Sequence, residues 1–197
     1  MNDFWNQRYS SIEYAYGEAP NEFVKVQLSK LQPGTILFPA EGEGRNAVYA
    51  ALQNWKVSAF DSSSEGRKKA FQLAKKYNVN IDYRITTYEE VNFQTESFDC
   101  VVLVFAHMPP AKRSEYHQKL WSFLKPGGTL LLEGFHKNQI FRNSGGPKNI
   151  DMLFSEAELS NDFSAASELS VSETETELNE GKFHRGTASI IRVIARK

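Results

Sequence analysis

Two glycines separated by one residue, Gly42 and Gly44, stand where a short apolar run ends and a helical pattern begins. The apolar run is Ile36–Phe38, and the helical pattern starts at Ala47. Glycines let the backbone turn sharply at the end of a strand and leave room for a ligand against the main chain. The free N–H groups of the following helix N-terminus can then bind polar atoms of that ligand. The pattern predicts a nucleotide-type binding loop, although an isolated G-x-G also occurs in ordinary tight turns.

Two longer patterns limit what this loop is expected to bind. The dinucleotide fingerprint G-x-G-x-x-G would place its third glycine where this chain has Ala47. Alanine is a permitted variant there, because that glycine serves close packing of the helix on the strand. The pattern G-x-x-x-x-G-K-[ST] does not occur in the sequence, so phosphate binding of the NTPase type is not expected.

The four histidines are the candidate groups for proton transfer. His107 lies just beyond the apolar run Phe98–Phe105, and His136 follows the next predicted strand, so both are expected at the ligand-binding edge of a sheet. Imidazole can orient a nucleophile or accept its proton near neutral pH. For each of the two, a structural histidine is the alternative. His184, at a predicted hairpin, and His117, inside a predicted helix, are expected to be structural or surface residues.

Composition excludes several classes of protein. With 197 residues and a net charge of −1, the chain is long enough for one domain and has no excess positive charge for nucleic acid. Its single cysteine, Cys100, lies in an apolar run and is expected to be a buried hydrophobe, in a protein of the reducing cytoplasm. We find no signal peptide and no apolar run near the roughly 20 residues of a membrane helix. No two histidines have metal-ligand spacing, so no metal site is predicted.

Strand and helix patterns alternate along the first two thirds of the chain. Short apolar runs bounded by turn residues predict strands, and apolar residues at helical spacing after a capping residue predict helices. The predicted strands are Thr35–Phe38, Lys56–Phe60, Ile81–Ile85, Phe98–Phe105 and Thr129–Glu133, and the predicted helices begin at Asn21, Gly44, Ser62 and Pro109.

The last third of the chain has a different pattern. Two long strand candidates, Ser164–Leu178 and Lys182–Arg196, are joined by a turn at Asn179–Gly181 and predict an antiparallel hairpin. Glu173, Glu175 and Glu177 would share one strand face, which is typical of a charged edge strand rather than a metal site. β-α repeats followed by such a hairpin predict an α/β fold with a doubly wound mixed sheet and helices on both faces.

The order and spacing of these motifs resemble the class I S-adenosylmethionine-dependent methyltransferases. Within them the chain is similar, over nearly its whole length, to small bacterial members of the tellurite-resistance type. That family has a Rossmann-like sheet of seven strands in the order 3-2-1-4-5-7-6 with the seventh antiparallel, which agrees with the predicted hairpin. The matching segments are Trp5–Tyr9, Tyr16–Asn21, the loop Ala40–Asn46 (AEGEGRN), the strand-end Asp61, Phe98–Val102 (FDCVV), Phe105–Pro110, Leu124–Gly128 (LKPGG) and Gly181–Gly186.

The resemblance implies S-adenosylmethionine as the cofactor, S-adenosylhomocysteine as the product, and a small-molecule methyl acceptor. In the family, the glycine loop surrounds the methionine part, and the strand-end acid accepts hydrogen bonds from both ribose hydroxyls. For Asp61 the alternative is an N-cap of the next helix. The implied cofactor-binding residues are Arg8, Ala40, Glu41, Gly42, Gly44, Asn46, Asp61, Ser62, Thr87, Tyr88, Phe105 and Ala106, and the candidate catalytic residues are His107 and His136.

The sequence departs from the family pattern at two positions. Many relatives carry an acid where this chain has Phe38 and an aspartate where it has Thr87; Glu41 or Glu43 is a candidate substitute for the first. A protein that binds the cofactor without turnover therefore stays open as an alternative to an active methyltransferase. An NAD-linked oxidoreductase is a weaker alternative: it would share the glycine loop and Asp61, but the turn LKPGG and the final antiparallel hairpin argue against it.

Two segments are predicted to cover the site within a single domain, which is divided into residues 1–33 and a core of residues 34–197. Residues 1–18 are rich in aromatics and are expected to form a lid that orders with the cofactor, although an ordinary packed helix would explain the same aromatics. The glycine-containing loop 141–148 is expected to cover the substrate. The sequence leaves the oligomeric state and the attacking atom of the acceptor open, with tellurite, thiols, amines, hydroxyls and carboxylates as candidates.

Overall fold

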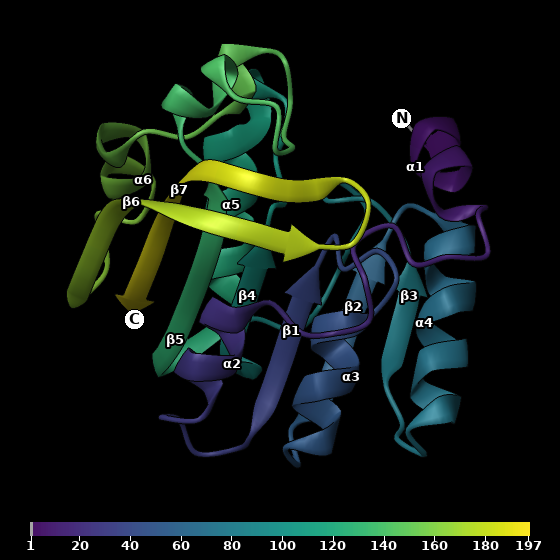
Figure 1. The fold of residues 1–197 in the computed structure, drawn as a ribbon. Coiled ribbons are helices and arrows are strands. Elements are labelled where there is room, and N and C mark those ends of the chain that lie inside the picture. Colours follow the sequence, from purple (N-terminus) through teal and green to yellow (C-terminus); the bar gives the residue numbers. More distant parts are fainter. Residues whose placement is uncertain (1) are drawn as a thin grey trace.

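The computed structural model describes residues 2–197 and contains one seven-stranded sheet with the strand order β3-β2-β1-β4-β5-β7-β6 (Figure 1). Strand β7 runs antiparallel to both of its neighbours, β5 and β6. This order confirms the predicted Rossmann-like mixed sheet. The strands are β1 (Thr35–Pro39), β2 (Lys56–Asp61), β3 (Asp82–Ile85), β4 (Phe98–Val104), β5 (Leu124–Phe135), β6 (Glu168–Glu180) and β7 (His184–Arg196).

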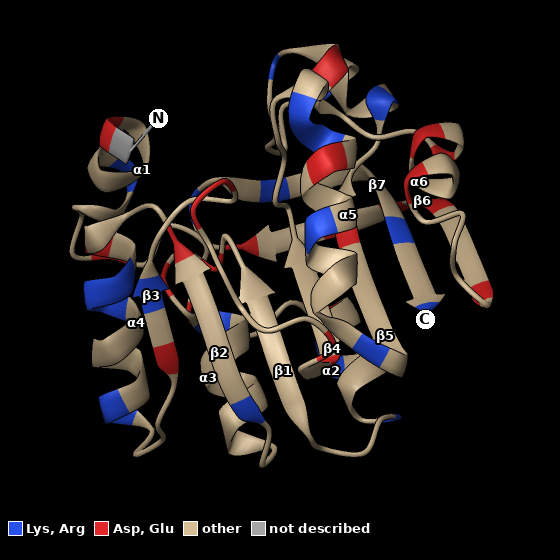
Figure 2. Cartoon of the chain, turned by 180° about the vertical axis from the view of Figure 1, so that it is seen from behind, with Lys and Arg blue, Asp and Glu red and all other residues tan. Residues whose placement is uncertain are grey.

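Helices cover both faces of the sheet (Figures 1 and 2). Helices α2 and α3 and part of α4 pack on one face, and α5 and α6 pack on the other. The α-helices are α1 (Asn2–Tyr9), α2 (Glu22–Leu28), α3 (Arg45–Leu52), α4 (Ser64–Lys76), α5 (Arg113–Phe123) and α6 (Glu156–Asp162), and the 3-10 turns are η1 (Pro110–Lys112), η2 (Lys137–Phe141) and η3 (Ile150–Met152). No helix in residues 2–197 has both the length and the apolar character of a membrane span.

Strand β4 shows how the sequence builds this layered core. Its side chains alternate between the two faces, as the period of a strand requires. Val101 and Leu103 pack with the α5 layer, whereas Cys100 and Val102 pack with the α2 and α3 layer. All four are buried, so the nearly continuous apolar run is that of a central parallel strand covered on both sides. Burial also raises the pKa of the Cys100 thiol, in agreement with the predicted role of a small hydrophobe.

Several element boundaries differ from those predicted, for local reasons. The helix expected from Pro109 begins as a 3-10 turn, and α5 starts only at Arg113. Proline has no N–H to donate, so two adjacent prolines suit a tight entry turn better than a helix interior. The hairpin strands are shifted, with β6 at Glu168–Glu180 and β7 at His184–Arg196, because the turn begins at Gly181, with its positive φ, instead of ending there.

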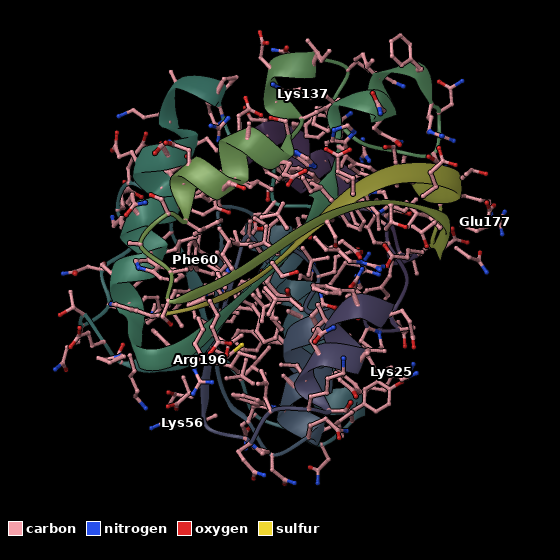
Figure 3. All side chains as sticks on the ribbon, turned by 90° about the vertical axis from the view of Figure 1, so that its left-hand side faces the viewer. Lys25, Lys56, Phe60, Lys137, Glu177 and Arg196 are labelled. Carbon is pink, nitrogen blue, oxygen red and sulfur yellow. The ribbon has the colours of Figure 1, made fainter. Side chains whose placement is uncertain are left out.

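The hairpin of β6 and β7 crosses the top of the sheet, and its tip lies near the N-terminal segment (Figure 1). The Lys182 N–H donates to the Ala15 carbonyl at 3.1 Å, which joins the two segments. Strand β6 is an edge strand with glutamates on its exposed side, as predicted. Figure 3 shows Glu177 projecting outward from the hairpin, whereas Phe60 lies inside the core.

Candidate functional site

The loop between β1 and α3 has three residues in the left-handed region: Ala40 (φ 51°), Gly42 (φ 62°) and Gly44 (φ 87°). The two glycines are needed for different contacts. A Cβ atom on Gly42 would lie 2.5 Å from the Tyr9 hydroxyl oxygen, and one on Gly44 would lie 2.6 Å from the Ala70 Cβ. Gly42 therefore allows a group to approach the loop from above, while Gly44 allows α4 to pack closely beneath it.

Asp61 lies at the end of β2, buried beside this loop. Its Oδ2 accepts the Gly42 N–H at 3.0 Å and its Oδ1 accepts the Ser63 N–H at 2.8 Å. Burial raises the pKa of Asp61, although these backbone donors act in the opposite direction. Each carboxylate oxygen has two lone pairs, so Asp61 can accept further donors. The N-cap of α4 is Ser63, whose Oγ accepts the Gly66 N–H at 3.0 Å, so the N-cap alternative for Asp61 does not apply.

Many relatives have an acid at the position of Phe38, and in this chain Glu41 supplies a carboxylate to the loop instead. Phe38 is fully buried in the core. The Glu41 Oε1 accepts the N–H groups of Asn46 and Ala47, both at 2.8 Å, and so closes the N-terminus of α3. Burial raises the pKa of Glu41 to about 7. The Asn46 side chain accepts the N–H of Asn21 at 2.9 Å, so it connects α3 to the start of α2.

Glu43 points away from the loop and holds the N-terminal segment. Its Oε1 forms a buried ion pair with the Lys69 ammonium at 2.5 Å, and its Oε2 accepts the Ala15 N–H at 2.8 Å. Lys69 also donates to the Glu13 carbonyl at 2.6 Å. One buried ion pair thus joins the glycine loop, α4 and residues 13–15.

The N-terminal aromatics lie over the loop. Tyr9 is buried, and its hydroxyl group covers Gly42. Arg8 was among the expected cofactor-binding residues, but its guanidinium stacks on the Phe183 ring at 3.8 Å and donates to the Tyr16 hydroxyl at 3.3 Å. In this conformation Arg8 therefore faces the hairpin. A cavity of about 330 Å³ lies on this side, lined in part by Phe4, Arg8, Tyr14, Lys182 and Phe183.

The ends of β3 and β4 form the other side of the site. The Tyr88 ring stacks on Tyr116 and meets Phe60 edge-on, with centroids 5.1 and 5.4 Å away. Its hydroxyl is buried and has no partner among residues 2–197, although a buried donor normally has one. Thr87 accepts the Glu90 N–H at 3.3 Å and is bound into its own turn. Ser62 is half-buried beside Asp61, Ala106 is buried, and Phe105 is partly buried.

Both ring nitrogens of His107 are hydrogen-bonded. Its Nδ1 donates to the Met152 carbonyl at 2.7 Å, and its Nε2 accepts the Phe135 N–H at 3.1 Å. The ring stacks on Phe154, with centroids 4.5 Å apart. Burial lowers the pKa of His107 to about 4. This geometry favours the structural alternative, since neither nitrogen is available to an acceptor.

The protonation of His107 predicts a pH effect on stability. Its folded pKa of about 4 is below the ordinary 6.5, so the unfolded chain binds more protons between these values. The free energy of unfolding should therefore fall as the pH drops from about 6.5 to about 4, by up to about 3 kcal/mol from this group. Glu41, with its raised pKa, acts in the opposite direction.

The measurement is urea unfolding across this pH range for the parent and for His107→Gln. The difference between the pH dependence of stability in the parent and in the variant gives the contribution of His107 separately from that of the carboxyl groups. Equal pH slopes in both proteins would show that His107 does not carry the effect.

Both ring nitrogens of His136 also have polar partners. Its Nδ1 accepts the Asn138 N–H at 3.2 Å, and its Nε2 lies 3.0 Å from a carboxylate oxygen of Glu173. This arrangement fixes the 3-10 turn after β5 and ties it to the edge strand. It also favours a structural histidine over a catalytic one.

His184, expected to be structural or at the surface, is only 5% exposed and lies at the ligand-binding edge of the sheet. Its ring is 4.4 Å from that of Tyr16 and 4.5 Å from that of Phe105. Sequence reasoning missed this position, although its motif Gly181–Gly186 had been singled out. His117 is fully buried in α5, with Nδ1 2.8 Å from Asp162, as expected of a structural residue. In residues 2–197 no cluster of three or more His, Cys, Asp or Glu side chains could hold a metal ion.

Comparison with known proteins finds similarity to methyltransferases in part of the core. A model of the methyltransferase domain matches residues 36–128, which contain the glycine loop, Asp61 and β4. The ubiquinone/menaquinone biosynthesis C-methyltransferase UbiE of Geotalea daltonii is 24% identical over 140 residues, or 68% of this chain. The chain spans 57% of the length of that relative.

Solved structures share the fold. TehB from Haemophilus influenzae superposes with a TM-score of 0.75 at 20% identity, covering 100% of this chain and 66% of TehB. A 1,6-didemethyltoxoflavin-N1-methyltransferase from Burkholderia thailandensis, solved with S-adenosylhomocysteine, gives a TM-score of 0.63 at 19% identity, covering 89% and 75% of the two chains. The match to a methyltransferase domain and the antiparallel β7 argue against the alternative of an NAD-linked oxidoreductase. Residues 36–128 therefore match the methyltransferase domain, and the chain as a whole has the fold of S-adenosylmethionine-dependent methyltransferases of known structure.

Proposed function

We propose that this chain transfers the methyl group of S-adenosylmethionine to a small-molecule acceptor. The observation that carries the proposal is Asp61, a buried carboxylate at the end of β2, with one oxygen bound to the backbone of the glycine loop and the other to the turn after β2. It is rigidly placed and keeps spare lone pairs, so it suits the two hydroxyls of a ribose. The unpartnered Tyr88 hydroxyl, buried near the same strand ends, fits a polar atom of the nucleoside.

The cofactor residues that we propose form a continuous path along the ends of β1, β2, β3 and β4. The loop would hold the methionine part, Asp61 the ribose, the turn after β3 the adenine, and the turn after β4 the sulfonium. When bound, the cofactor supplies a methyl group on a positively charged sulfur. The residues assigned to this path are Ala40, Glu41, Gly42, Gly44, Asn46, Asp61, Ser62, Thr87, Tyr88, Phe105 and Ala106, with Arg8 at its rim.

The chain contributes mainly position and exclusion of water, since methyl transfer is an in-line displacement. Tyr9 covers Gly42, and the ion pair between Glu43 and Lys69 holds residues 13–15 beside the loop. We propose that residues 1–18 act as the lid of the site. In the structure the buried Tyr9 lies over Gly42, so the cofactor must enter by displacing Tyr9 or by passing beside it.

The proposed acceptor site is covered on several sides, and this favours a small acceptor. The turn after β4 is covered by the N-terminal segment and by the hairpin tip, and Gly145 of the loop 141–148 packs against His184. The Burkholderia neighbour carries a small acceptor, 1,6-didemethyltoxoflavin, in its structure, which supports this size class. Binding without turnover is the second candidate, favoured by the occupied nitrogens of His107 and His136.

The Asp61→Ala variant tests the cofactor site. It removes up to two charge-assisted hydrogen bonds to the ribose, each contributing roughly 1.5–3 kcal/mol. We therefore expect affinity for S-adenosylhomocysteine to fall by about tenfold or more for each bond lost. Isothermal titration calorimetry measures this directly. Asp82→Ala is the matched control, because Asp82 is an exposed aspartate on neighbouring β3.

Unchanged affinity in Asp61→Ala would show that the loop is only a structural turn. Methyl transfer separates the two candidate functions. Binding of S-adenosylhomocysteine by the parent, with no product from any acceptor in a broad panel of small molecules, would favour the protein without turnover.

A further inference from the structure

His184 and Glu180 face one another across the hairpin turn. Glu180 ends β6 and His184 begins β7, and the two residues are paired in the strand register. The His184 Nδ1 lies 3.2 Å from Glu180 Oε2. Because a carboxylate only accepts, Nδ1 carries the proton and Nε2 presents its lone pair. Among residues 2–197, that Nε2 has no hydrogen-bond partner.

The Glu180 carboxylate is held in its ionised form. Arg45, at the first turn of α3, pairs with the same Oε2 at 2.9 Å. Burial alone would raise the pKa of Glu180, but the His184 hydrogen bond and the Arg45 charge lower it to about 2. Arg45 directly follows Gly44, so the pair is anchored to the cofactor loop. Glu180 can thus stabilise an imidazolium that forms on His184.

The ring of His184 lies where an acceptor is expected. It is surrounded by Tyr16 from the N-terminal segment, Phe105 at the end of β4 and Phe135 at the end of β5. A Cβ atom on Gly145 would lie 2.7 Å from its Cδ2, so the loop 141–148 closes one side. These aromatic surfaces suit a flat or small organic molecule.

The four histidines differ in what their second nitrogen does. His107 and His136 have both nitrogens bonded. The Nε2 of His117 is unpartnered, but it is fully buried between α5 and α6, where the other ring nitrogen is paired with Asp162. His184 alone combines an available nitrogen with a place beside the turn after β4.

We propose that His184, oriented by Glu180, is the proton acceptor of the transfer, and that the acceptor is therefore a neutral nucleophile that carries a proton. The inference rests on the proposed function. As the attacking atom bonds to the methyl carbon, the carbon–sulfur bond breaks and its electron pair stays on sulfur. The proton of the attacking atom passes to Nε2 and then to solvent. Burial lowers the pKa of His184, so the ring is neutral and able to accept it near pH 7.

The experiment compares pairs of thiol and hydroxyl acceptors whose members differ in how far the attacking atom is already ionised. Methyl transfer is measured at about pH 7.5 to 2-mercaptoethanol and 4-nitrothiophenol, and to phenol and 4-nitrophenol; the nitro compounds are the more ionised partner of each pair. His184→Gln should slow transfer to the neutral member by roughly 10²–10⁴-fold, and to the ionised member by far less. His136→Gln is the matched control, a buried histidine of the same sheet edge, and should leave the ratio within each pair unchanged.

Glu180→Gln tests the positioning role through the pH profile. The groups that face His184 are Glu180, Arg45, Arg8, Tyr16 and His107, and only Glu180 raises the pKa of His184. Its loss should move the acidic limb of kcat to lower pH and reduce kcat for the neutral acceptors. If the acidic limb of the kcat–pH profile stays at the same pH in Glu180→Gln, the role of Glu180 is contradicted.

Equal slowing of both members of a pair by His184→Gln would overturn the proposal, because a structural disturbance does not distinguish them. Failure of the parent to methylate any of the four probes would overturn the assigned acceptor class. Calorimetry with S-adenosylhomocysteine keeps these results separate from a failure of the proposed function. His184→Gln should bind it as the parent does, whereas an absent cofactor site would abolish binding in both.

Discussion

Lys69→Met is expected to destabilise the protein by roughly 3–5 kcal/mol, because it leaves the Glu43 carboxylate buried without its cation. The side chains of Lys69 and Glu43 are only 7% and 4% exposed. Methionine keeps the length of the lysine stem, so the loss reflects the charge and its hydrogen bonds. Residues 13–15 also lose the bond from Lys69 to the Glu13 carbonyl. Urea unfolding measures the stability, and hydrogen exchange should show faster exchange at residues 13–16.

Two controls test this interpretation. Lys68→Met removes the neighbouring lysine, which is 66% exposed and 3.7 Å from Glu65, and should change stability by less than about 1 kcal/mol. The double variant Lys69→Met with Glu43→Gln should recover part of the loss, since no charge is then buried alone. A loss no larger than that of Lys68→Met would show that the buried pair is not what holds the N-terminal segment.

Gly44→Ala is expected to destabilise the fold by roughly 2–5 kcal/mol, the sum of two effects. A left-handed conformation costs an alanine about 1–2 kcal/mol, and overpacking costs about 1–3 kcal/mol. Gly44 has a φ of 87°, and an added Cβ would lie 2.6 and 2.8 Å from the Cβ and Cα of Ala70. Relief requires α4 to move away from the loop, which would also displace the site around Asp61.

Gly127→Ala is the control for Gly44→Ala. Gly127 has a φ of 77°, and an added Cβ would meet nothing within 4 Å. This variant therefore shows the backbone strain alone, of about 1–2 kcal/mol. Both variants are compared by urea unfolding. Equal losses in the two would show that close packing of α4 on the loop contributes nothing measurable.

The fold could be predicted because its signals are local. The alternation of β4, the positive-φ glycines of the loop and the turn at Gly181 each act within a few residues. The order of strand and helix patterns then restricts the possible topologies. Boundaries were less accurate where two local preferences compete, as at Pro109 and Pro110, which allow a tight turn or a helix start.

Candidate residues could be placed at one edge of the sheet from the sequence, since the carboxyl ends of parallel strands meet there. The hydrogen bonds and orientations of their side chains depend on partners that are distant in the sequence. His107 is held by Met152 and Phe135, and Arg8 is drawn to Phe183. No pattern around His107 or Arg8 contains these partners.

The sequence by itself determined the class of fold, the glycine loop and the acid beside it, because backbone conformation and hydrophobic period are properties of neighbouring residues. Only the tertiary structure decided which carboxylate serves the loop and which serves the N-terminal segment, Glu41 or Glu43. It also decided that His184, and neither His107 nor His136, has a nitrogen available at the site. A lone pair is available only where packing leaves it without a donor, and packing joins segments that the sequence keeps far apart.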